Sequence, residues 1–275
     1  MKERIIVAAV FVPILLVIVF FLPPYVFVGL VALICAVSAY ELLHAIGAKG
    51  NERITIYAVF SAALIPIGIY FDVGLHAFMA VFLVLLSFVF IETAAVFRTK
   101  REISFAQVMT SMFGGALIPL LLSSLVGLKN MPEGRLFVLL PVVSAFITDA
   151  GAYFSGMLFG KKKAFPLISP KKTVEGCVGG LVVGTAALMI YGVILVFSTV
   201  YEIKFWALLI YGIVGGVATI LGDLAFSMVK REFNVKDYGR LLPGHGGMLD
   251  RFDSMVFTAP AIYLMVTVIP AIIVI

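Results

Sequence analysis

Charged residues are scarce in this sequence. Asp, Glu, Lys and Arg make up 13% of its 275 residues, whereas hydrophobic residues make up 63% and the mean hydropathy is +1.17. A water-soluble domain of this size would be less than half apolar by the same count. The composition therefore excludes a soluble globular protein and indicates a polytopic membrane protein. Since the longest polar stretch is the loop at 229–249, no attached water-soluble domain is expected.

Cysteine pairs and a cleavable signal are missing as well. Cys35 and Cys177 lie in apolar or glycine-rich stretches without metal-type spacing, so we expect small core residues rather than a disulfide or metal ligands. The first apolar run, residues 5–22, is longer than the hydrophobic region of a secretory signal and lacks a small-residue cleavage site. This run therefore predicts a first membrane helix.

Hydrophobic stretches long enough to cross a bilayer, at about 20 residues each, recur along the whole chain. They predict an all-α, polytopic integral membrane bundle of about nine transmembrane helices. The predicted spans are 4–22, 25–46, 54–71, 75–97, 103–128, 136–159, 174–198, 204–228 and 250–274. Prolines inside several spans are compatible with a bundle, because neighbouring helices satisfy the freed carbonyl groups.

The distribution of basic residues predicts the orientation of the chain. With the N-terminus in the cytoplasm, 17 of the 20 Lys and Arg residues fall on the cytoplasmic side, and only Lys129, Arg135 and Lys204 fall outside. The positive-inside rule favours this arrangement, which leaves the C-terminus outside. We therefore expect a protein of the bacterial inner (plasma) membrane whose most basic loops face the cytoplasm.

We expect the nine spans to form two parts. Spans one to five, within residues 1–135, form an N-terminal part. Spans six to nine, within residues 136–275, are expected to form a C-terminal part, whose cytoplasmic loops 160–173 and 229–249 open on the same face.

The segment 227–253 combines a glycine run with two acids. Glycines in Pro243-Gly244-His245-Gly246-Gly247 permit unusual dihedrals and leave backbone N–H groups open to close approach. Asp250 and Asp253 are three residues apart, so on a helix their side chains lie about 60° apart on one face. Two converging carboxylates repel each other unless a cation such as Mg²⁺ sits between them. Acids that only complement the helix dipole are the alternative.

A second polar constellation lies in residues 148–180. Asp149 is inside span six, where an unpaired carboxylate would be costly. The run Ser169-Pro170-Lys171-Lys172-Thr173 leads into span seven, and a hydroxyl with two ammonium groups at a helix N-terminus favours a phosphate. Attraction to anionic lipid headgroups explains Lys161 to Lys163, but it explains the run at 169–173 less well. The spacing of a P-loop is absent.

These two segments resemble the phosphatidate cytidylyltransferases, also called CDP-diacylglycerol synthases. The resemblance covers roughly 148–274, and the first five spans share only their hydrophobicity. The residues that carry it are Asp149, Tyr153, Phe159-Gly160-Lys161, Ser169 to Thr173, Glu175-Gly176, Ser227, Lys230-Arg231, Lys236-Asp237, Gly239, Pro243 to Gly247, Asp250-Arg251 and Asp253.

The resemblance implies that CTP and phosphatidic acid react to give CDP-diacylglycerol and pyrophosphate in phospholipid biosynthesis, with Mg²⁺ as cofactor; a second cation is left open. The expected metal ligands are Asp223, Asp250 and Asp253. These three, with Lys171 and Arg251, are the expected catalytic residues, so residues 136–275 are the expected catalytic part and the active site is expected to face the cytoplasm. The expected substrate-binding residues are Asp149, Ser169, Lys171, Lys172, Thr173, Ser227, Lys230, Arg231, Lys236, Asp237, Gly244, His245, Gly246 and Gly247.

Two rival functions remain as alternatives. A membrane transporter would distribute acids across the bilayer, whereas the acids here crowd toward one face. A CTP-dependent polyprenol or lipid kinase would also bind CTP and a lipid in a basic site. Membrane lipids are expected partners, nucleic acid is not, and glycine-rich faces permit a homodimer without requiring it. The roles of Glu41 and Glu92, which lie in or near spans, are left open.

Overall fold

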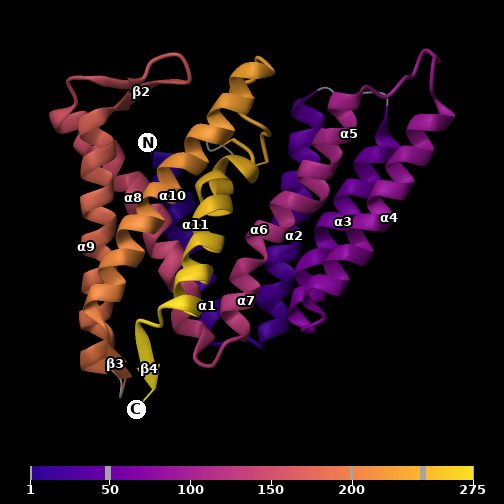
Figure 1. Ribbon diagram of the computed structural model, residues 1–275. Helices are drawn as coiled ribbons and strands as arrows, with labels where there is room; N and C mark the ends of the chain where they lie inside the picture. Colours follow the sequence, from indigo (N-terminus) through magenta and orange to yellow (C-terminus); the bar gives the residue numbers. More distant parts are fainter. Residues whose placement is uncertain (1, 47–50, 199–200, 242–245, 275) are drawn as a thin grey trace. The chain divides into compact units, whose positions relative to one another are not determined.

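The computed structural model describes the chain except residues 1, 47–50, 199–200, 242–245 and 275. Helices dominate the described part and confirm the all-α membrane class (Figure 1). Seven helical stretches in it are long and apolar enough to cross a membrane. The helices α1 (Lys2–Phe20) and α11 (Leu249–Val268) lie where the other two spans were predicted. Neither is among the seven, so the count of nine stays a prediction.

Contacts between residues divide the chain into two compact units, which are described separately. Unit 1 comprises Met1–Arg135 and Phe233–Phe252, and unit 2 comprises Leu136–Glu232 and Asp253–Ile275. The loop segment after α10 thus groups with the N-terminal helices. The boundary between the units crosses the first turns of α11, between Phe252 and Asp253.

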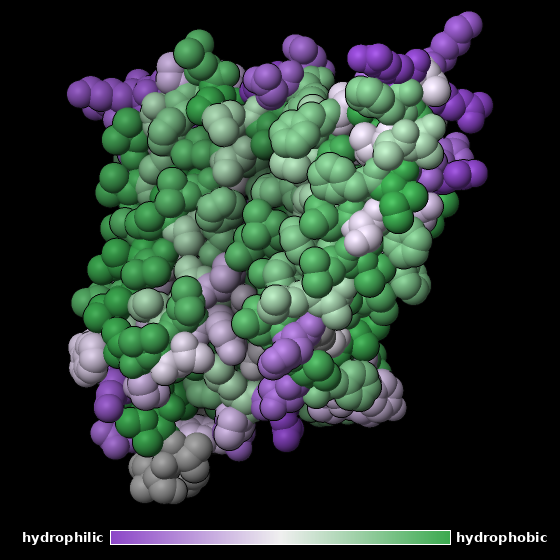
Figure 2. Space-filling model, turned by 45° about the vertical axis from the view of Figure 1, so that its right-hand side comes forward, coloured by the Kyte–Doolittle hydropathy of each residue, from purple (hydrophilic) through white to green (hydrophobic). Residues whose placement is uncertain are grey.

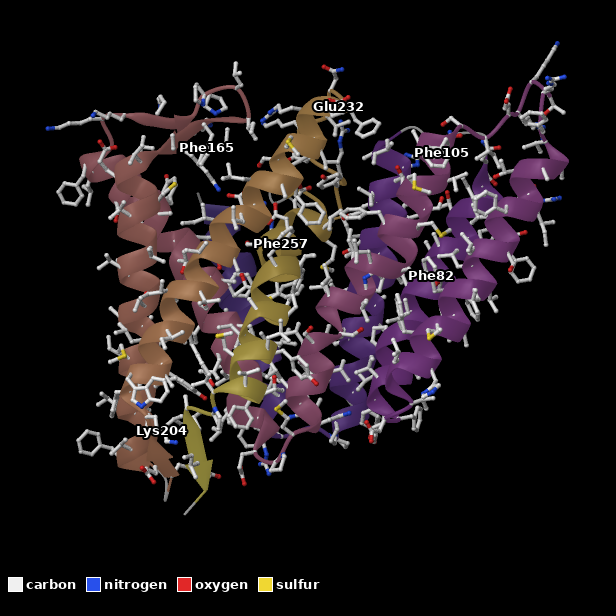
Figure 3. All side chains as sticks on the ribbon, in the orientation of Figure 1. Phe82, Phe105, Phe165, Lys204, Glu232 and Phe257 are labelled. Carbon is white, nitrogen blue, oxygen red and sulfur yellow. The ribbon has the colours of Figure 1, made fainter. Side chains whose placement is uncertain are left out.

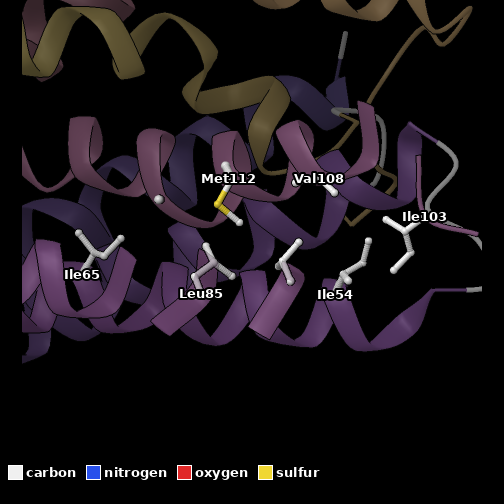
Figure 4. Close-up of a cluster of buried hydrophobic side chains, with 8 residues drawn as sticks. Ile54, Ile65, Leu85, Ile103, Val108 and Met112 are labelled. Carbon is white, nitrogen blue, oxygen red and sulfur yellow. The ribbon is translucent and has the colours of Figure 1, made fainter. Parts of the chain in front are cut away.

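Unit 1 is built from antiparallel helices that follow one another through short connections. Its elements are α1 (Lys2–Phe20), α2 (Pro24–Ala45), α3 (Glu52–Tyr70), α4 (Gly74–Ala95), α5 (Phe105–Met112), the π-helix η1 (Phe113–Leu117), α6 (Ile118–Leu122) and α7 (Ser124–Asn130). Buried side chains of α3, α4 and α5 form a hydrophobic core that includes Ile54, Leu85 and Met112 (Figure 4). Cys35 is a free thiol buried in α2, which confirms the expected core position, whereas Cys177, in the later helix Val174–Ser198, is only half-buried.

The fifth predicted span is broken into four helical pieces, and Pro119 accounts for the break. A proline has no N–H for the carbonyl group four residues earlier, which here belongs to Gly115. The Ser61 hydroxyl of α3 donates a buried hydrogen bond of 2.9 Å to that carbonyl oxygen. Close approach makes this possible, because a Cβ on Gly115 would lie 2.9 Å from the Cα of Ala58. The π-helical turn at Phe113–Leu117 is therefore stabilised by a partner that is distant in the sequence.

Substitution of Ser61 by alanine is expected to destabilise unit 1 by about 1–3 kcal/mol, because it leaves the buried Gly115 carbonyl without its donor. Thr110→Ala is the matched control, since its hydroxyl bonds Ala106 within its own helix at an exposed position. Thermal denaturation in detergent should show a lower melting temperature for S61A than for T110A. Equal melting temperatures would show that the bond adds nothing.

Unit 2 consists of four long helices with two short antiparallel strand pairs. Its elements are α8 (Gly134–Phe159, from Leu136 onward), β1 (Lys163–Phe165), β2 (Ser169–Thr173), α9 (Val174–Ser198), β3 (Tyr201–Ile203), α10 (Phe205–Glu232), α11 (Leu249–Val268, from Asp253 onward) and β4 (Ile272–Val274). Strand β1 pairs with β2, and β3 pairs with β4. Phe165 on the hairpin and Glu232 on α10 lie at one end of the unit and Lys204 at the other (Figure 3).

The last predicted span, 250–274, is helical only as far as Val268. Pro270 explains the stop, because a residue before proline is disfavoured in the helical region. The β-branched residues that follow form β4. Tyr211 stabilises this end: its hydroxyl donates to the carbonyl oxygen of Ile269 at 2.5 Å and accepts the Ala271 N–H at 3.2 Å.

The surface of the helices is apolar. Exposed large hydrophobic side chains include Phe60, Phe88, Ile91, Val182 and Leu221. Figure 2 shows hydrophobic side chains along the sides of the helices and hydrophilic ones gathered toward their ends. This distribution fits helices whose sides face hydrocarbon, so the chain is an integral membrane protein.

Candidate active site

The lysine-rich loop of unit 2 is an ordered hairpin that is fastened at both ends. At its base, the backbone N–H groups of Lys161 and Lys162 donate to the Glu175 carboxylate at 3.0 and 3.2 Å. At its turn, Arg231 Nε of α10 donates to the carbonyl oxygen of Ile168 at 3.2 Å. The predicted phosphate-binding run at 169–173 is strand β2 of this hairpin.

Thr173 joins this strand to α9. Its hydroxyl accepts the Gly176 N–H at 3.1 Å, which is the bond of a helix N-cap, and the residue is 7% exposed. Thr173 therefore holds the start of α9. Sequence reasoning predicted a substrate-binding role for this hydroxyl, which stays a prediction.

The two adjacent lysines of β2 have different surroundings. Successive side chains of a strand point to opposite faces. Lys172 is partly buried, and its Nζ lies 2.5 Å from Asp223 Oδ2. Lys171 is exposed, as are Lys236, Asp237 and the predicted catalytic Arg251. Of the two hairpin lysines that were predicted as site residues, only Lys172 is thus seen in contact with a predicted metal ligand.

Helix α10 presents three polar side chains toward this region at the spacing of one helical face. Ser227 Oγ donates to Asp223 Oδ1, one turn earlier, at 3.2 Å. Lys230 Nζ lies 3.7 Å from Asp253 Oδ2 of α11. The Lys230 and Asp253 side chains are only 12% and 10% exposed, so water screens this ion pair weakly.

Ser254 links α11 to α8. Its hydroxyl donates to Asp149 Oδ2 at 2.7 Å, and its backbone N–H donates to Asp253 Oδ1 at 2.8 Å. Asp149 and Asp223 both lie near enough to Asp253 to repel its charge. Ser254 was missed by the sequence reasoning, although its place directly after Asp253 was a usable signal.

These contacts unite residues from four elements of unit 2. We call them the acid–lysine cluster. Its members are Asp149, Lys172, Asp223, Ser227, Lys230, Asp253 and Ser254.

Asp250, in the first turn of α11 and in unit 1, has different partners. Its Oδ2 accepts the backbone N–H groups of Tyr238 at 2.8 Å and Gly247 at 3.0 Å. Gly246 beside it has φ = +86°, which favours glycine. The predicted residues Gly244 and His245 lie outside the described residues.

A buried glutamate completes this part of unit 1. The Glu41 carboxylate of α2 accepts the backbone N–H groups of Met248 and Leu249, both at 2.9 Å. Glu92 forms an ion pair with Arg53, whose Nη1 lies 3.3 Å from Glu92 Oε1. Sequence reasoning left both glutamates open, and the structure gives each a defined partner.

The donor chemistry fits a magnesium ion, although the described residues include no group of three or more His, Cys, Asp or Glu side chains close enough to hold a metal. Mg²⁺ prefers oxygen ligands and is commonly bound by one or two carboxylates together with substrate phosphates. Asp223 and Asp253 supply two such carboxylates in unit 2, and they form ion pairs with Lys172 and Lys230 respectively.

The whole length of the chain resembles one protein family. A family model described as the cytidylyltransferase family matches residues 2–269. The chain belongs to the cytidylyltransferase family. The sequence predicted membership of this family, and the family model confirms it.

Curated members of this family align with half of the chain. The phosphatidate cytidylyltransferase of Staphylococcus saprophyticus is 45% identical over 137 residues, which is 50% of this chain and 51% of the relative. That of Staphylococcus haemolyticus is 42% identical over 133 residues, or 48% and 50% of the two chains. That of Staphylococcus aureus strain COL is 39% identical over 137 residues, or 50% and 51%. The chain thus spans about half the length of the curated relatives it matches.

Proposed function

We propose that this cytidylyltransferase-family member transfers CMP from CTP to phosphatidic acid, giving CDP-diacylglycerol and pyrophosphate. The observation that carries the proposal is the acid–lysine cluster, which brings carboxylates and ammonium groups from four elements together in a membrane protein of this family. The names of the curated relatives support the same substrates.

The proposed reaction requires neutralisation of the phosphate charges more than it requires a strong base. A phosphomonoester has a second pKa of about 6, so phosphatidic acid is largely dianionic at pH 7 and its oxygen is already nucleophilic. Its attack on the α-phosphorus of CTP brings two anions together. Preorganised cations that meet the developing charge therefore account for most of the expected rate enhancement.

The residues of the cluster match this requirement. Lys172 and Lys230 are held in place by Asp223 and Asp253, and we assign both ammonium groups to phosphate oxygens of the substrates. Ser227 and Ser254 orient the carboxylates of Asp223 and Asp149 through hydrogen bonds. Arg231 fixes the turn of the hairpin and so keeps Lys172 near α10.

Magnesium is part of the proposal. Asp223 and Asp253 are the residues of unit 2 that would hold it, and Asp250 stays the third predicted ligand. When bound, Mg²⁺ neutralises phosphate charge and orients the triphosphate. We place this site on the cytoplasmic side of the inner membrane, because the basic residues of the chain favour that orientation.

Labelled CTP tests the function directly. Purified protein in detergent with phosphatidic acid and Mg²⁺ should transfer label from [α-³²P]CTP, and not from [γ-³²P]CTP, into the lipid fraction. Incorporation of the γ-label would instead identify a lipid kinase. Ion flux through reconstituted liposomes without CTP, combined with no transfer of either label, would favour a transporter.

A further inference from the structure

Glu41 is a buried acid that the proposed reaction has not used. It lies in the apolar helix α2, 4% exposed, and both of its carboxylate oxygens accept backbone N–H groups from the start of α11. More than 200 residues separate the donors from the acceptor, and all of them belong to unit 1. A buried carboxylate is costly unless it is hydrogen-bonded, so these bonds fix its position.

Two glycines leave the space that the carboxylate occupies. A Cβ at Gly239 or at Gly247 would meet the Glu41 carboxylate itself. Neither glycine has a positive φ, so their small size, rather than their backbone freedom, is what this packing requires. Gly239 belongs to the residues that carry the family resemblance, and in the structure it packs against Glu41 of α2.

Glu41 and Asp250 together organise the segment around the beginning of α11. Glu41 binds the N–H groups of Met248 and Leu249, and Asp250 binds those of Tyr238 and Gly247. The first N–H groups of a helix have no partner within the helix, and the helix dipole favours negative charge there. Glu41 and Asp250 thus fix the backbone at the start of α11, which carries Arg251 and Asp250 itself.

We propose that Glu41 is a positioning residue for the cytidylyl transfer, which acts by fixing the start of α11 and does not itself bind substrate. The inference rests on the proposed function, since Asp250 and Arg251 matter for catalysis only if that function holds. It gives Glu41, on the apolar helix α2 of unit 1, a role that the hydrophobic sequence of this helix did not indicate. Glu41 is a fixed anchor, not a placeholder that a substrate phosphate displaces.

Steady-state kinetics with CTP and phosphatidic acid test this role. Glu41→Gln should lower kcat by about 10- to 100-fold, the usual effect of removing a residue that orients a catalytic group, and should change KM for CTP little. Hydrogen exchange at the amides of Met248 and Leu249 should become faster in the same variant. Glu92→Gln is the matched control, because its carboxylate pairs with the exposed Arg53 in the same unit.

Gly247→Ala provides a second, independent variant. Its new methyl group should push the Glu41 carboxylate away from the amides and reproduce both effects of Glu41→Gln. Glu41→Ala creates room for the new methyl group. Gly247→Ala should therefore lower kcat less in the Glu41→Ala background than in the wild-type protein. If Glu41→Gln does not fold, kcat and amide exchange in Gly247→Ala decide whether Glu41 is a positioning residue.

The outcomes separate the inference from the function. Wild-type kcat and exchange in Glu41→Gln would overturn the positioning role while the function stands. A lower KM for CTP would overturn it too, since that result is expected if Glu41 only occupies an anion site. If the wild-type protein transfers no label, the proposed function fails, and the exchange rates of Met248 and Leu249 still show whether Glu41 anchors α11.

Discussion

Replacing Asp253 by asparagine is expected to lower kcat for CDP-diacylglycerol formation by about 10²–10³-fold, because the variant loses a preorganised charge at the centre of the acid–lysine cluster. Asparagine keeps the shape of the side chain, and its oxygen can still accept the Ser254 N–H. The Lys230 ammonium loses its anionic partner, and one carboxylate is lost from the proposed magnesium site. Transfer of α-label from CTP, measured over a range of Mg²⁺ concentrations, should show a higher Mg²⁺ requirement as well.

The control for Asp253 is Glu202→Gln, which removes one exposed acid from strand β3 in the same unit. It should leave both kcat and the Mg²⁺ requirement unchanged. A loss of only about twofold in Asp253→Asn, with that control normal, would contradict the assignment of Asp253, since a group that orients reacting phosphates contributes far more. Circular dichroism of both variants should match the wild-type spectrum, because neither substitution changes side-chain volume in the packed helices.

Hydropathy alone predicted where the helices lie, because a bilayer requires long apolar segments and little else. It did not predict how those segments are interrupted. The break in the fifth span follows from Pro119, but the donor that satisfies the freed Gly115 carbonyl is Ser61 of α3, and the strand β4 pairs with Tyr201–Ile203. Neither contact has a local signature, since each joins residues far apart in the sequence.

The hairpin of unit 2 shows the same limit at the candidate site. The lysines of 161–172 and the glycine before them predict an exposed loop, whereas the structure pairs β1 with β2 and adds contacts with Glu175 and Arg231. Once the strands form, alternation separates Lys171 from Lys172. A count of positive charges treats those two lysines as equal.

Sequence reasoning predicted a site role for some of the buried acids but not for all of them. Asp149, Asp223 and Asp253 were predicted as site residues from their cost in a membrane and from the family resemblance, and the structure gathers them in unit 2. Glu41 was the harder case. An isolated glutamate in a 22-residue apolar helix signals a function, but its partners are backbone amides more than 200 residues away.

The glycines near residue 246 were predicted to open backbone N–H groups to a ligand. In the structure, the Gly247 N–H is donated to Asp250, and Gly239 and Gly247 make room for Glu41. The same residue type thus serves packing here, a difference that composition cannot reveal. Magnesium, the membrane orientation and the individual substrate contacts stay predictions.

Replacing Lys172 by glutamine is expected to lower kcat/KM for CTP by about 100-fold, because this lysine brings a positive charge from the hairpin to Asp223, with its Nζ 2.5 Å from Oδ2. Glutamine can still donate a hydrogen bond but cannot neutralise phosphate charge. Lys163→Gln, an exposed lysine on the same hairpin, is the control and should retain wild-type kcat/KM. Equal losses in both variants would mean that the hairpin acts only through its total charge. If Lys172 and Asp223 work as a pair, the loss of kcat/KM in the double variant Lys172→Gln with Asp223→Asn should differ strongly from the sum of the two single losses. Purely additive losses would contradict this coupling.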